Sequence, residues 1–348
     1  MNNTTSLEYD VAVLIGRFQG FHKGQESPLK KALESASRVI VVLGSSYRAR
    51  SAKNPFTWEE RAAMIACTLD EATKARVSFV PVRDYYDDKR WSAAVRAIVG
   101  SNCNDSERNI ALVGFHKDAS SYYLGLFPQW SFVESQQYDK IDATTVRQIY
   151  FEGDDPAATR ALLSGLVHPA VVSYLIGWMR LPQYAQMKKE HLAIEKSKKT
   201  WGVGPFITVD AVVTVSNHVL LVRRGGDVGN GLWAVPGGFL DSRERLLQGA
   251  IRELKEETGL AALNSSLEES LKGVAVFDHA DRGSRGRTIT HAHWFDLGES
   301  RRLPLVAGAD DAAEAKWIPF TDLPGMEEQF FEDHFSCILK HFLPIAEI

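Results

Sequence analysis

Three glutamates in the second half of the chain could together hold a divalent cation. Glu253, Glu256 and Glu257 are spaced by three or four residues, so a helix would bring them onto one face. Carboxylates gathered in this way repel each other unless a hard cation lies among them, and Mg²⁺ or Mn²⁺ suits oxygen ligands. Such an ion could bind pyrophosphate oxygens and activate water. The alternative is a solvated acidic helix, since Lys255 lies among the glutamates.

A second group of residues could hold phosphate through basic side chains. The stretch LIGRFQGFHKGQ begins as an apolar strand, breaks at Gly16, and then presents Arg17, His22 and Lys23 where a helix should begin. Unpaired N–H groups at a helix N-terminus bind anions, and Gly24 lets the backbone approach a ligand closely. The pattern predicts an anion site. The alternative is an ordinary strand–turn–helix junction with solvated basic residues.

The first half of the chain alternates strands with helices, which predicts a doubly wound parallel sheet of the Rossmann-like kind. The expected strands are 11–16, 39–44, 77–82 and 110–114, and the expected helices lie near 24–36, 57–73 and 91–99. Thr57 and Glu60 have the spacing of a capping box, which fixes one helix start. In such sheets ligands bind beyond the carboxyl ends of the strands. The segments expected to line the site follow Ile15, Gly44, Val82 and Gly114.

The remainder of the chain has a different pattern of predicted helices and strands. Residues 151–200 are mostly helical in pattern and end in a charged tract, which predicts a connector with a solvated face. From about residue 204 the pattern is rich in strands, interrupted by one strong helix over 243–258. The fold class is therefore α/β, with a second domain that combines a sheet and helices.

Composition limits the partners. Lys+Arg is 40 and Asp+Glu is 44, so the net charge of −4 indicates neither nucleic acid nor a membrane surface as partner. The three cysteines are scattered and predict reduced thiols. The apolar runs are too short to cross a bilayer, and the first residues lack a signal pattern, so we expect a cytoplasmic protein. A homo-oligomer is left open.

Four segments of the first half resemble one family in the family's own order. GRFQGFHKGQ resembles the nucleotidyltransferase signature GRFQPxHxGH, SAKNPFTWEER resembles the NPFTxxER element, RDYYDDKRW resembles the acidic-aromatic segment, and residues 141–147 resemble the signature I-S-x-T-x-x-R. They cover most of residues 11–150. The family is that of nicotinamide mononucleotide (NMN) adenylyltransferases, which make NAD and pyrophosphate from NMN and ATP.

The resemblance implies roles for individual residues. His22, Gln25 and Arg147 would be catalytic. The nucleotides would be bound by Gly16, Arg17, Phe18, Lys23, Gly24, Trp91, Asp142, Thr144 and Thr145. Thr144 and Thr145 are expected to cap the last helix, while Trp91 would stack on the cationic nicotinamide ring. Taken alone, Asp142 could equally be a plain N-cap and Trp91 a core residue.

Two residues depart from the family pattern. Gly20 replaces the proline of the signature and is expected to loosen the turn. Gln25 replaces its second histidine, and an amide can donate a hydrogen bond to phosphate but carries no positive charge. Losing one charge-assisted contact could cost roughly 10²–10³ in rate. The alternative is a first domain that binds nucleotide with little or no turnover.

The stretch GGFLDSRERLLQGAIRELKEETGL resembles the Nudix box at every fixed position. The matching residues are Gly238, Glu244, Arg252, Glu253, Leu254, Glu256, Glu257, Gly259 and Leu260. The resemblance implies that Glu253, Glu256 and Glu257 bind Mg²⁺, with Mn²⁺ as a substitute, and that Arg252 and Glu257 are catalytic. Arg252 is expected to orient a glutamate, and Gly259 suits a helix C-cap.

The segments flanking the box resemble the ADP-ribose-cleaving branch of the Nudix family. The residues expected to bind ADP-ribose are Arg224, Trp233, Gly238 and Arg287, with Arg223 and Arg285 as further candidates for phosphate or ribose. Trp233 could stack on adenine or belong to the core. The general base could be Asp310, Asp311, Glu314 or a glutamate of the box.

Together the two halves resemble a bacterial bifunctional family of NAD metabolism. The expected domains are 1–180, a nucleotidyltransferase domain with a helical extension; 181–203, a helical linker; and 204–348, an α/β/α Nudix domain with a mixed sheet. The expected substrates are ATP, NMN and ADP-ribose, the last giving AMP and ribose 5-phosphate. The alternatives are a Nudix hydrolase with a weakly active first domain and a regulator that binds ADP-ribose without cleaving it.

Overall fold

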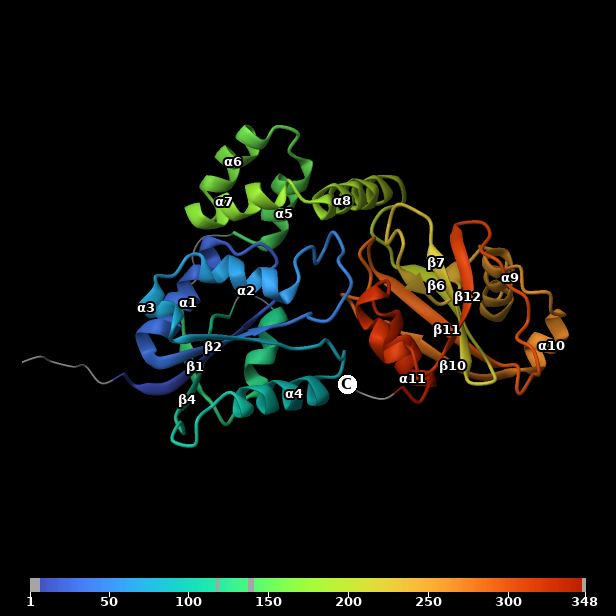
Figure 1. Cartoon of the computed structure of the whole chain (residues 1–348), viewed down its shortest axis with the longest axis horizontal. Helices are drawn as coiled ribbons and strands as arrows, with labels where there is room; N and C mark the ends of the chain where they lie inside the picture. The colour runs from blue at the N-terminus through green and yellow to red at the C-terminus, as the bar shows by residue number, and fades with distance from the viewer. Residues whose placement is uncertain (1–6, 117–118, 137–140, 346–348) are drawn as a thin grey trace, which may run out of the picture. The chain divides into compact units, whose positions relative to one another are not determined.

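The computed structural model describes residues 7–116, 119–136 and 141–345. The chain divides into two compact units, Met1–Lys188 and Lys189–Ile348 (Figure 1). The division lies within the helix α8 (Pro182–Trp201), in the stretch expected to connect the domains. Across the described residues, no helix combines the length and the apolar character that a membrane span needs.

The first unit is built on a five-stranded sheet in which every pairing is parallel. Its strands are β1 (Tyr9–Gly16), β2 (Ala36–Leu43), β3 (Val77–Pro81), β4 (Ile110–Gly114) and β5 (Ser131–Glu134). The spatial order β3-β2-β1-β4-β5 reverses between β1 and β4, which opens a crevice at the ends of these two strands. The predicted parallel α/β fold is confirmed.

Helices cover both faces of this sheet. They are α1 (Lys23–Ser35), α2 (Trp58–Ala66), α3 (Glu71–Lys74), α4 (Asp88–Ser101) and the 3₁₀ helix η1 (Ala119–Leu126). Successive residues of β1 point to opposite faces, so Ala12 and Leu14 enter one core cluster while Val11 and Val13 enter the other. Burial on both faces explains why these strands are continuous apolar runs.

The helix predicted over 57–73 is in fact two helices. The capping box at its start is confirmed, since Thr57 N–H donates to Glu60 and Thr57 Oγ1 accepts from Glu60 N–H at 3.3 Å. The chain leaves the helix after Ala66, and Asp70 is the N-cap of α3, because its carboxylate accepts from Thr73 N–H at 2.7 Å. This second N-cap starts a new helix, so the single helix that the apolar pattern predicted is interrupted.

The first unit continues as a helical extension. It consists of α5 (Ala143–Glu152), α6 (Pro156–Ser164), α7 (Pro169–Trp178) and the first part of α8. The extension is tied to α2 through Glu60, which accepts a hydrogen bond from Trp178 Nε1 at 3.0 Å. The ring of Trp178 also packs edge-on against Phe56, 4.9 Å between centroids. The helical character predicted for 151–200 is confirmed.

The second unit contains a mixed sheet, as predicted. Its strands are β6 (Phe206–Val215), β7 (His218–Arg224), β8 (Trp233–Ala234), β9 (Gly237–Phe239), β10 (Leu271–Phe277), β11 (Thr288–Asp296) and β12 (Ala312–Pro319). The main path runs β10-β11-β6-β7-β12, and β11 pairs in parallel with β6 whereas the other pairings are antiparallel.

Helices lie on both sides of the second sheet (Figure 1). They are α9 (Leu246–Thr258), α10 (Asn264–Glu269), the 3₁₀ helix η2 (Leu323–Gln329), the π-helix η3 (His334–Leu339) and α11 (Lys340–Phe342). Leu254 of α9 is buried in one core cluster and Ile338 of η3 in the other. The helix predicted over 243–258 begins three residues late, because Gln248 Oε1 accepts from Arg245 N–H and makes Arg245 its N-cap.

The turn between β1 and α1 depends on Gly20, whose φ of +93° lies in the region that favours glycine. Proline is fixed near −65°, so the residue of the family signature could not adopt this conformation. This position therefore needs a residue that tolerates positive φ; whether Gly20 also loosens the turn stays a prediction.

Gly20→Ala should lower the free energy of unfolding by about 1–3 kcal/mol, because the residue would be strained at positive φ. Its Cβ would also lie 3.3 Å from a Val146 methyl carbon. Gly100→Ala is the matched control, since it lies in α4 with open space around it and should leave stability equal or higher. Denaturant unfolding measures both. Equal destabilisation by the two variants would contradict this account of the turn.

Candidate functional sites

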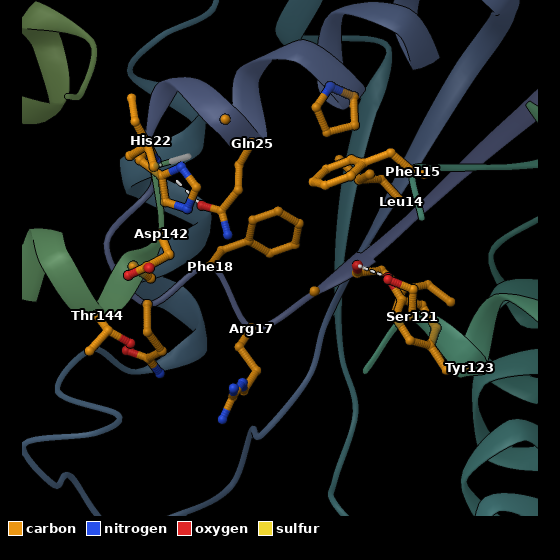
Figure 2. A pocket seen from close by; sticks show the side chains of 18 of the residues that line it. Leu14, Arg17, Phe18, His22, Gln25, Phe115, Ser121, Tyr123, Asp142 and Thr144 are labelled. Atoms are coloured by element: carbon orange, nitrogen blue, oxygen red, sulfur yellow. Dashed lines mark hydrogen bonds between the residues drawn. The ribbon is translucent and has the colours of Figure 1, made fainter. Parts of the chain in front are cut away.

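The first candidate site is a cavity of about 300 Å³ at the carboxyl ends of β1 and β4. Its lining includes most of the predicted residues, namely Gly16, Arg17, Phe18, His22, Gly24, Gln25, Asp142, Thr144 and Arg147. In Figure 2 the polar residues His22, Gln25, Asp142 and Thr144 lie on one side of Phe18, and Leu14, Phe115, Ser121 and Tyr123 lie on the other. The cavity thus has a polar end suited to phosphate and an end of aromatic, aliphatic and hydroxyl groups.

Two buried polar side chains hold the first signature in place. Gln19 donates from Nε2 to the carbonyl of Phe56 and accepts from the N–H of Phe56, both at 3.0 Å. Arg61 of α2 is 1% exposed and donates to the carbonyls of Arg17 and Gly44. Burial lowers the pKa of Arg61 to about 10, a cost that these contacts offset. The NPFT element therefore positions the phosphate turn, a contribution that the sequence did not reveal.

Gly16 and Gly24 make room for side chains of the site itself. A Cβ at Gly16 would lie 2.9 Å from the Phe18 ring, and one at Gly24 would lie 3.0 Å from His22 Nδ1. Phe18 in turn has a φ of +50°, which is uncommon for a bulky residue. The glycines thus admit the Phe18 and His22 rings that line the cavity.

Gln25 has a structural role that its position in the signature did not suggest. Its Oε1 accepts a hydrogen bond from the N–H of His22, the N-cap of α1, at 3.3 Å. This is the reciprocal contact that a glutamine at the third helical position makes in a capping box. The bond leaves the amide nitrogen of Gln25, which lines the cavity, free to donate (Figure 2). Phosphate binding by Gln25 stays a prediction.

Positive charge at the polar end is incompletely balanced. Burial and, to a smaller extent, the nearby Arg17 lower the pKa of Arg147 to about 10, although Asp142 partly opposes both effects. Arg147 is aimed by hydrogen bonds from Nη1 to the Gln19 carbonyl, 3.0 Å, and from Nη2 to Thr144 Oγ1, 3.4 Å. A bound anion would relieve the repulsion between the two arginines.

The cap of α5 is Asp142, whose Oδ1 accepts from the N–H of Thr145 at 2.8 Å. The prediction that Thr144 and Thr145 cap this helix was therefore wrong. The physical reason is that the Asp142 carboxylate, two residues before Thr144, already accepts from a free N–H group of the first turn, and the alternative that Asp142 is the N-cap is confirmed. Thr144 is left to contact Arg147 and to line the cavity.

Some predicted residues lie elsewhere. Lys23 turns its ammonium group to the carbonyl of Gly165, 2.9 Å away, and Thr145 does not line the cavity. Trp91 packs edge-on against Tyr123 and Phe127 within a core cluster, so its stacking on nicotinamide stays a prediction.

Other residues of the cavity were not predicted individually. They are Gln19, Lys53, Asn54, Phe115, Ser121 and Tyr123, with apolar neighbours. Asn54 belongs to the quoted NPFT element, so the resemblance could have singled it out. Its Oδ1 is buried and has no hydrogen-bond partner among the described residues. It is therefore an acceptor that a ligand could use.

The second candidate site centres on Arg252 of α9. Its guanidinium donates to both oxygens of Glu244, at 2.7 and 3.0 Å, and to Glu253 and Glu256, each at 2.8 Å. Hydrogen bonds to these three carboxylates raise the pKa of Arg252. The expectation that Arg252 orients a glutamate is in keeping with these contacts.

Glu257 takes a different direction from the other glutamates of the box. It is 3% exposed, and its Oε2 accepts from the N–H of Gly237 at 2.9 Å. Burial raises the pKa of Glu257 to about 9, helped by a hydrogen bond with Asp311. The neighbouring carboxyl groups of Glu257 and Asp311 are oxygen donors to which a cation could bind.

The three glutamates do not meet in this conformation. Among the described residues, no three His, Cys, Asp or Glu side chains are grouped closely enough to hold a metal ion. The reason is that Arg252 neutralises Glu253 and Glu256, whereas Glu257 is held by Gly237. The donor set nevertheless fits a hard cation, because these oxygens and Asp311 are carboxylates. A Cβ at Gly238 would clash with the Glu253 carboxylate, so glycine is needed there.

The structure separates the three acids proposed near the end of the sheet. Asp311 contacts Glu257. Glu314 instead pairs with Arg223 at 3.1 Å, and Asp310 occupies a turn position with a φ of +54°. Of the three, Asp311 is the one in hydrogen-bond contact with a glutamate of the box.

The residues expected to bind ADP-ribose are in varied surroundings. Trp233 is 4% exposed and is covered by the Arg223 guanidinium, 4.3 Å from its ring centre, so stacking on adenine would require Arg223 to move. Arg224 lies over Phe331, also at 4.3 Å, and donates to the carbonyl of Val228. Arg287 has a buried Nη1 with no hydrogen-bond partner among the described residues.

Comparisons with known proteins agree with this geometry. Residues 13–149 match the cytidylyltransferase-like family and residues 204–339 match the NUDIX domain, so the chain joins a nucleotidyltransferase domain to a Nudix domain. It is similar to a bifunctional NMN adenylyltransferase/ADP ribose pyrophosphatase from Francisella tularensis, whose crystal structure contains AMP and a Mn ion. The identity is 34%, the TM-score is 0.85, and the match covers 96% of this chain and 99% of that one.

Two curated proteins resemble the halves separately. The nicotinamide/nicotinic acid mononucleotide adenylyltransferase of Acinetobacter baylyi is 33% identical over 55% of this chain and 97% of its own length. The ADP-ribose pyrophosphatase of Methanocaldococcus jannaschii is 33% identical over 37% of this chain and 73% of its own length. The chain belongs to the family of bifunctional NMN adenylyltransferase/ADP-ribose pyrophosphatases.

The loop before the box rests on Asp210, because a Cβ at Gly237 would clash with Asp210 Oδ1. Burial raises the pKa of Asp210 to about 7, against the charges of Arg282 and Arg224; the carboxylate of Asp333 adds to the rise. The folded protein therefore keeps this proton at pH values where the unfolded chain releases it. The free energy of unfolding should fall as the pH rises from about 4 to about 7.

Asp210→Asn removes this titration, so the variant should gain stability relative to wild type as the pH rises from 5 to 7. Denaturant unfolding at pH 5, 6 and 7 measures the difference. Asp322→Asn, an exposed aspartate beyond β12, is the control and should follow the wild-type curve. Parallel curves for Asp210→Asn and wild type would contradict the burial of a protonated acid.

Proposed function

We infer that the first unit transfers the adenylyl group of ATP to NMN, giving NAD and pyrophosphate. The observation that carries this inference is the cavity in which Arg17, His22 and Arg147 meet at the end of a parallel sheet. Adenylyl transfer needs positioning and charge neutralisation more than covalent help from the protein. These groups would hold the triphosphate, while His22 and Gln25 would donate hydrogen bonds where charge develops.

Mg²⁺ is the cofactor that we propose for both reactions, with Mn²⁺ as a substitute. In the first unit it would neutralise phosphate charge. In the second unit Glu253, Glu256 and Glu257 would be its ligands. The relative from Francisella tularensis, with its Mn ion, supports the choice of a divalent metal.

We propose that the second unit hydrolyses ADP-ribose to AMP and ribose 5-phosphate. A bound divalent ion would polarise the diphosphate and lower the pKa of water. Asp311, in contact with Glu257, is our choice among the candidates for the general base. Arg252 would keep the box glutamates oriented, and Arg224, Arg285 and Arg287 would face the charged substrate.

The alternatives differ in what they require of these groups. A regulator that binds ADP-ribose without cleaving it has no need of the full set of carboxylates around Arg252. A hydrolase with an inert first unit would have no use for the partly uncompensated charge of Arg17 and Arg147. NMN as substrate rather than its deamidated analogue, a cytoplasmic location and a homo-oligomer stay predictions.

Gln25→Glu tests the first reaction. The carboxylate can still accept from His22 N–H, so the helix cap is kept, but the donor is lost and a negative charge meets the phosphates. We expect kcat/KM for pyrophosphate release from NMN and ATP to fall by roughly 10²–10³. Lys30→Met, an exposed change on the same helix, is the control. Full activity in Gln25→Glu would show that the Gln25 amide does not contribute to the reaction.

Gln25→His tests whether the capping contact matters. Imidazole would restore the family's residue but would lose the bond to His22 N–H, so the free energy of unfolding should fall by about 0.5–2 kcal/mol. Unfolding and activity should be measured on the same preparation. Unchanged stability would indicate that the amide of Gln25 does not close the helix.

Glu256→Gln tests the second reaction. We expect hydrolysis of ADP-ribose with Mg²⁺ to fall by about 100-fold or more, since loss of even an outer partner of a metal site costs about 10–100-fold. Glu268→Gln, an exposed change on α10, is the control. Chromatography of AMP gives the rate. Hydrolysis by Glu256→Gln at the wild-type rate would contradict the assignment of metal ligands.

A further inference from the structure

A buried ion pair in the second unit joins the loop between β10 and β11 to the C-terminal part of the chain. Arg282, in this loop, donates from Nε and Nη2 to the two carboxylate oxygens of Asp333, both at 2.9 Å. Its Nη1 donates to Thr290 Oγ1 at 2.6 Å. Arg282 is 4% exposed and Asp333 1%. All three N–H-bearing atoms of the guanidinium are thus engaged.

The residues on either side of Asp333 make three more ties, and we call Phe331, Glu332, Asp333 and His334 the clamp. Glu332 Oε1 accepts from the N–H and the hydroxyl of Ser284, each at 2.8 Å. Phe331 N–H donates to the carbonyl of Trp233 at 2.8 Å, and His334 Nδ1 accepts from Val235 N–H at 3.2 Å. The clamp therefore fixes both the loop 278–287 and the segment that leads into the Nudix box.

Stability alone is a poor explanation for such a pair. The desolvation of two charges consumes most of their attraction, and well-packed apolar residues of similar volume often stabilise a protein as much or more. What a bidentate pair supplies is a fixed geometry for the backbone that carries it. A residue of the loop 278–287 should therefore depend on that geometry.

Arg285 is the residue of this loop that we infer depends on the fixed backbone. It directly follows Ser284 in the loop, so the ties at Arg282 and Ser284 fix the backbone just before it. Its guanidinium lies 4.9 Å from the ring centre of Phe239, in the strand next to Gly238. It makes no hydrogen bond to another residue of the described ranges. Burial lowers the pKa of Arg285 and the nearby Glu332 carboxylate raises it; Arg224 adds to the lowering, while Asp311 near the box opposes it. A half-buried cation with all its donors free suits a bound anion.

We propose that the clamp positions Arg285 to bind the diphosphate of ADP-ribose, with Asp333 and Arg282 as positioning residues. This inference rests on the proposed hydrolase function of the second unit. Asp333 and Arg282 act through the backbone of the loop and touch no substrate, whereas Arg285 would donate directly to phosphate oxygens. Loss of the clamp should therefore weaken binding and leave the chemical step nearly intact.

The test compares Asp333→Asn, Arg285→Met and the double variant, using the full chain with Mg²⁺ and ADP-ribose. Each single variant should raise KM by roughly 10–100-fold with kcat nearly unchanged. The double variant should be no worse than Arg285→Met, because both changes remove the same contact. The Kd of the non-hydrolysable α,β-methylene analogue of ADP-ribose should rise in parallel with KM.

Other outcomes would overturn the inference. Additive effects of Asp333→Asn and Arg285→Met would show that the pair serves the fold only, and an unchanged KM in Arg285→Met would remove Arg285 from the site. If Asp333→Asn fails to fold, Glu332→Gln and Ser284→Ala weaken the tie between Ser284 and Glu332 and should raise KM only when Arg285 is present. No hydrolysis by wild type would refute the proposed function itself, and the inference with it.

Discussion

Both sites depend on like charges that the fold holds close together. In the first unit Arg17 and Arg147 line one cavity, and Asp142 offsets only part of their repulsion. In the second unit α9 carries several carboxylates: Arg252 neutralises Glu253 and Glu256, whereas Glu257 is buried beside Asp311 and has a raised pKa. Each arrangement is electrostatically unfavourable, and a ligand of opposite charge would relieve the repulsion.

The fold imposes these arrangements through contacts remote from the charges. In the first unit the strand order opens the crevice, and Gln19 and Arg61 fasten the turn to the segment after β2. In the second unit glycines 237 and 238 let the loop lie against Asp210 and Glu253. A rigid scaffold of this kind is what allows electrostatic preorganisation, since groups that could relax apart would not stay poised for phosphate.

The sequence predicted those features that depend on local pattern. Strand-length apolar runs gave the parallel sheet, Thr57 and Glu60 gave a helix start, and the glutamate spacing located α9. Gly259 indeed ends that helix with a φ of +59°. These features are set within a few residues, so periodicity and capping chemistry are enough to find them.

What the sequence did not reveal depends on distant partners or on competition between neighbours. Lys23 turns to Gly165, 142 residues away, and Asp142 takes the cap that the threonines were expected to make. Arg252 joins carboxylates that were expected to surround a cation. Neither spacing nor residue type tells which of several acceptors a long side chain will reach, because that choice is made by packing.

The central claim is that the basic groups lining the cavity of the first unit hold a triphosphate. A crystal structure of the full chain with α,β-methylene ATP and Mg²⁺ tests it most directly. We predict phosphate oxygens within hydrogen-bond distance of Arg17, His22, Arg147 and the Gln25 amide nitrogen, with the adenine towards Phe115 and Tyr123. A nucleotide bound with its phosphates away from these groups, or a cavity left empty at saturating concentration, would contradict the account.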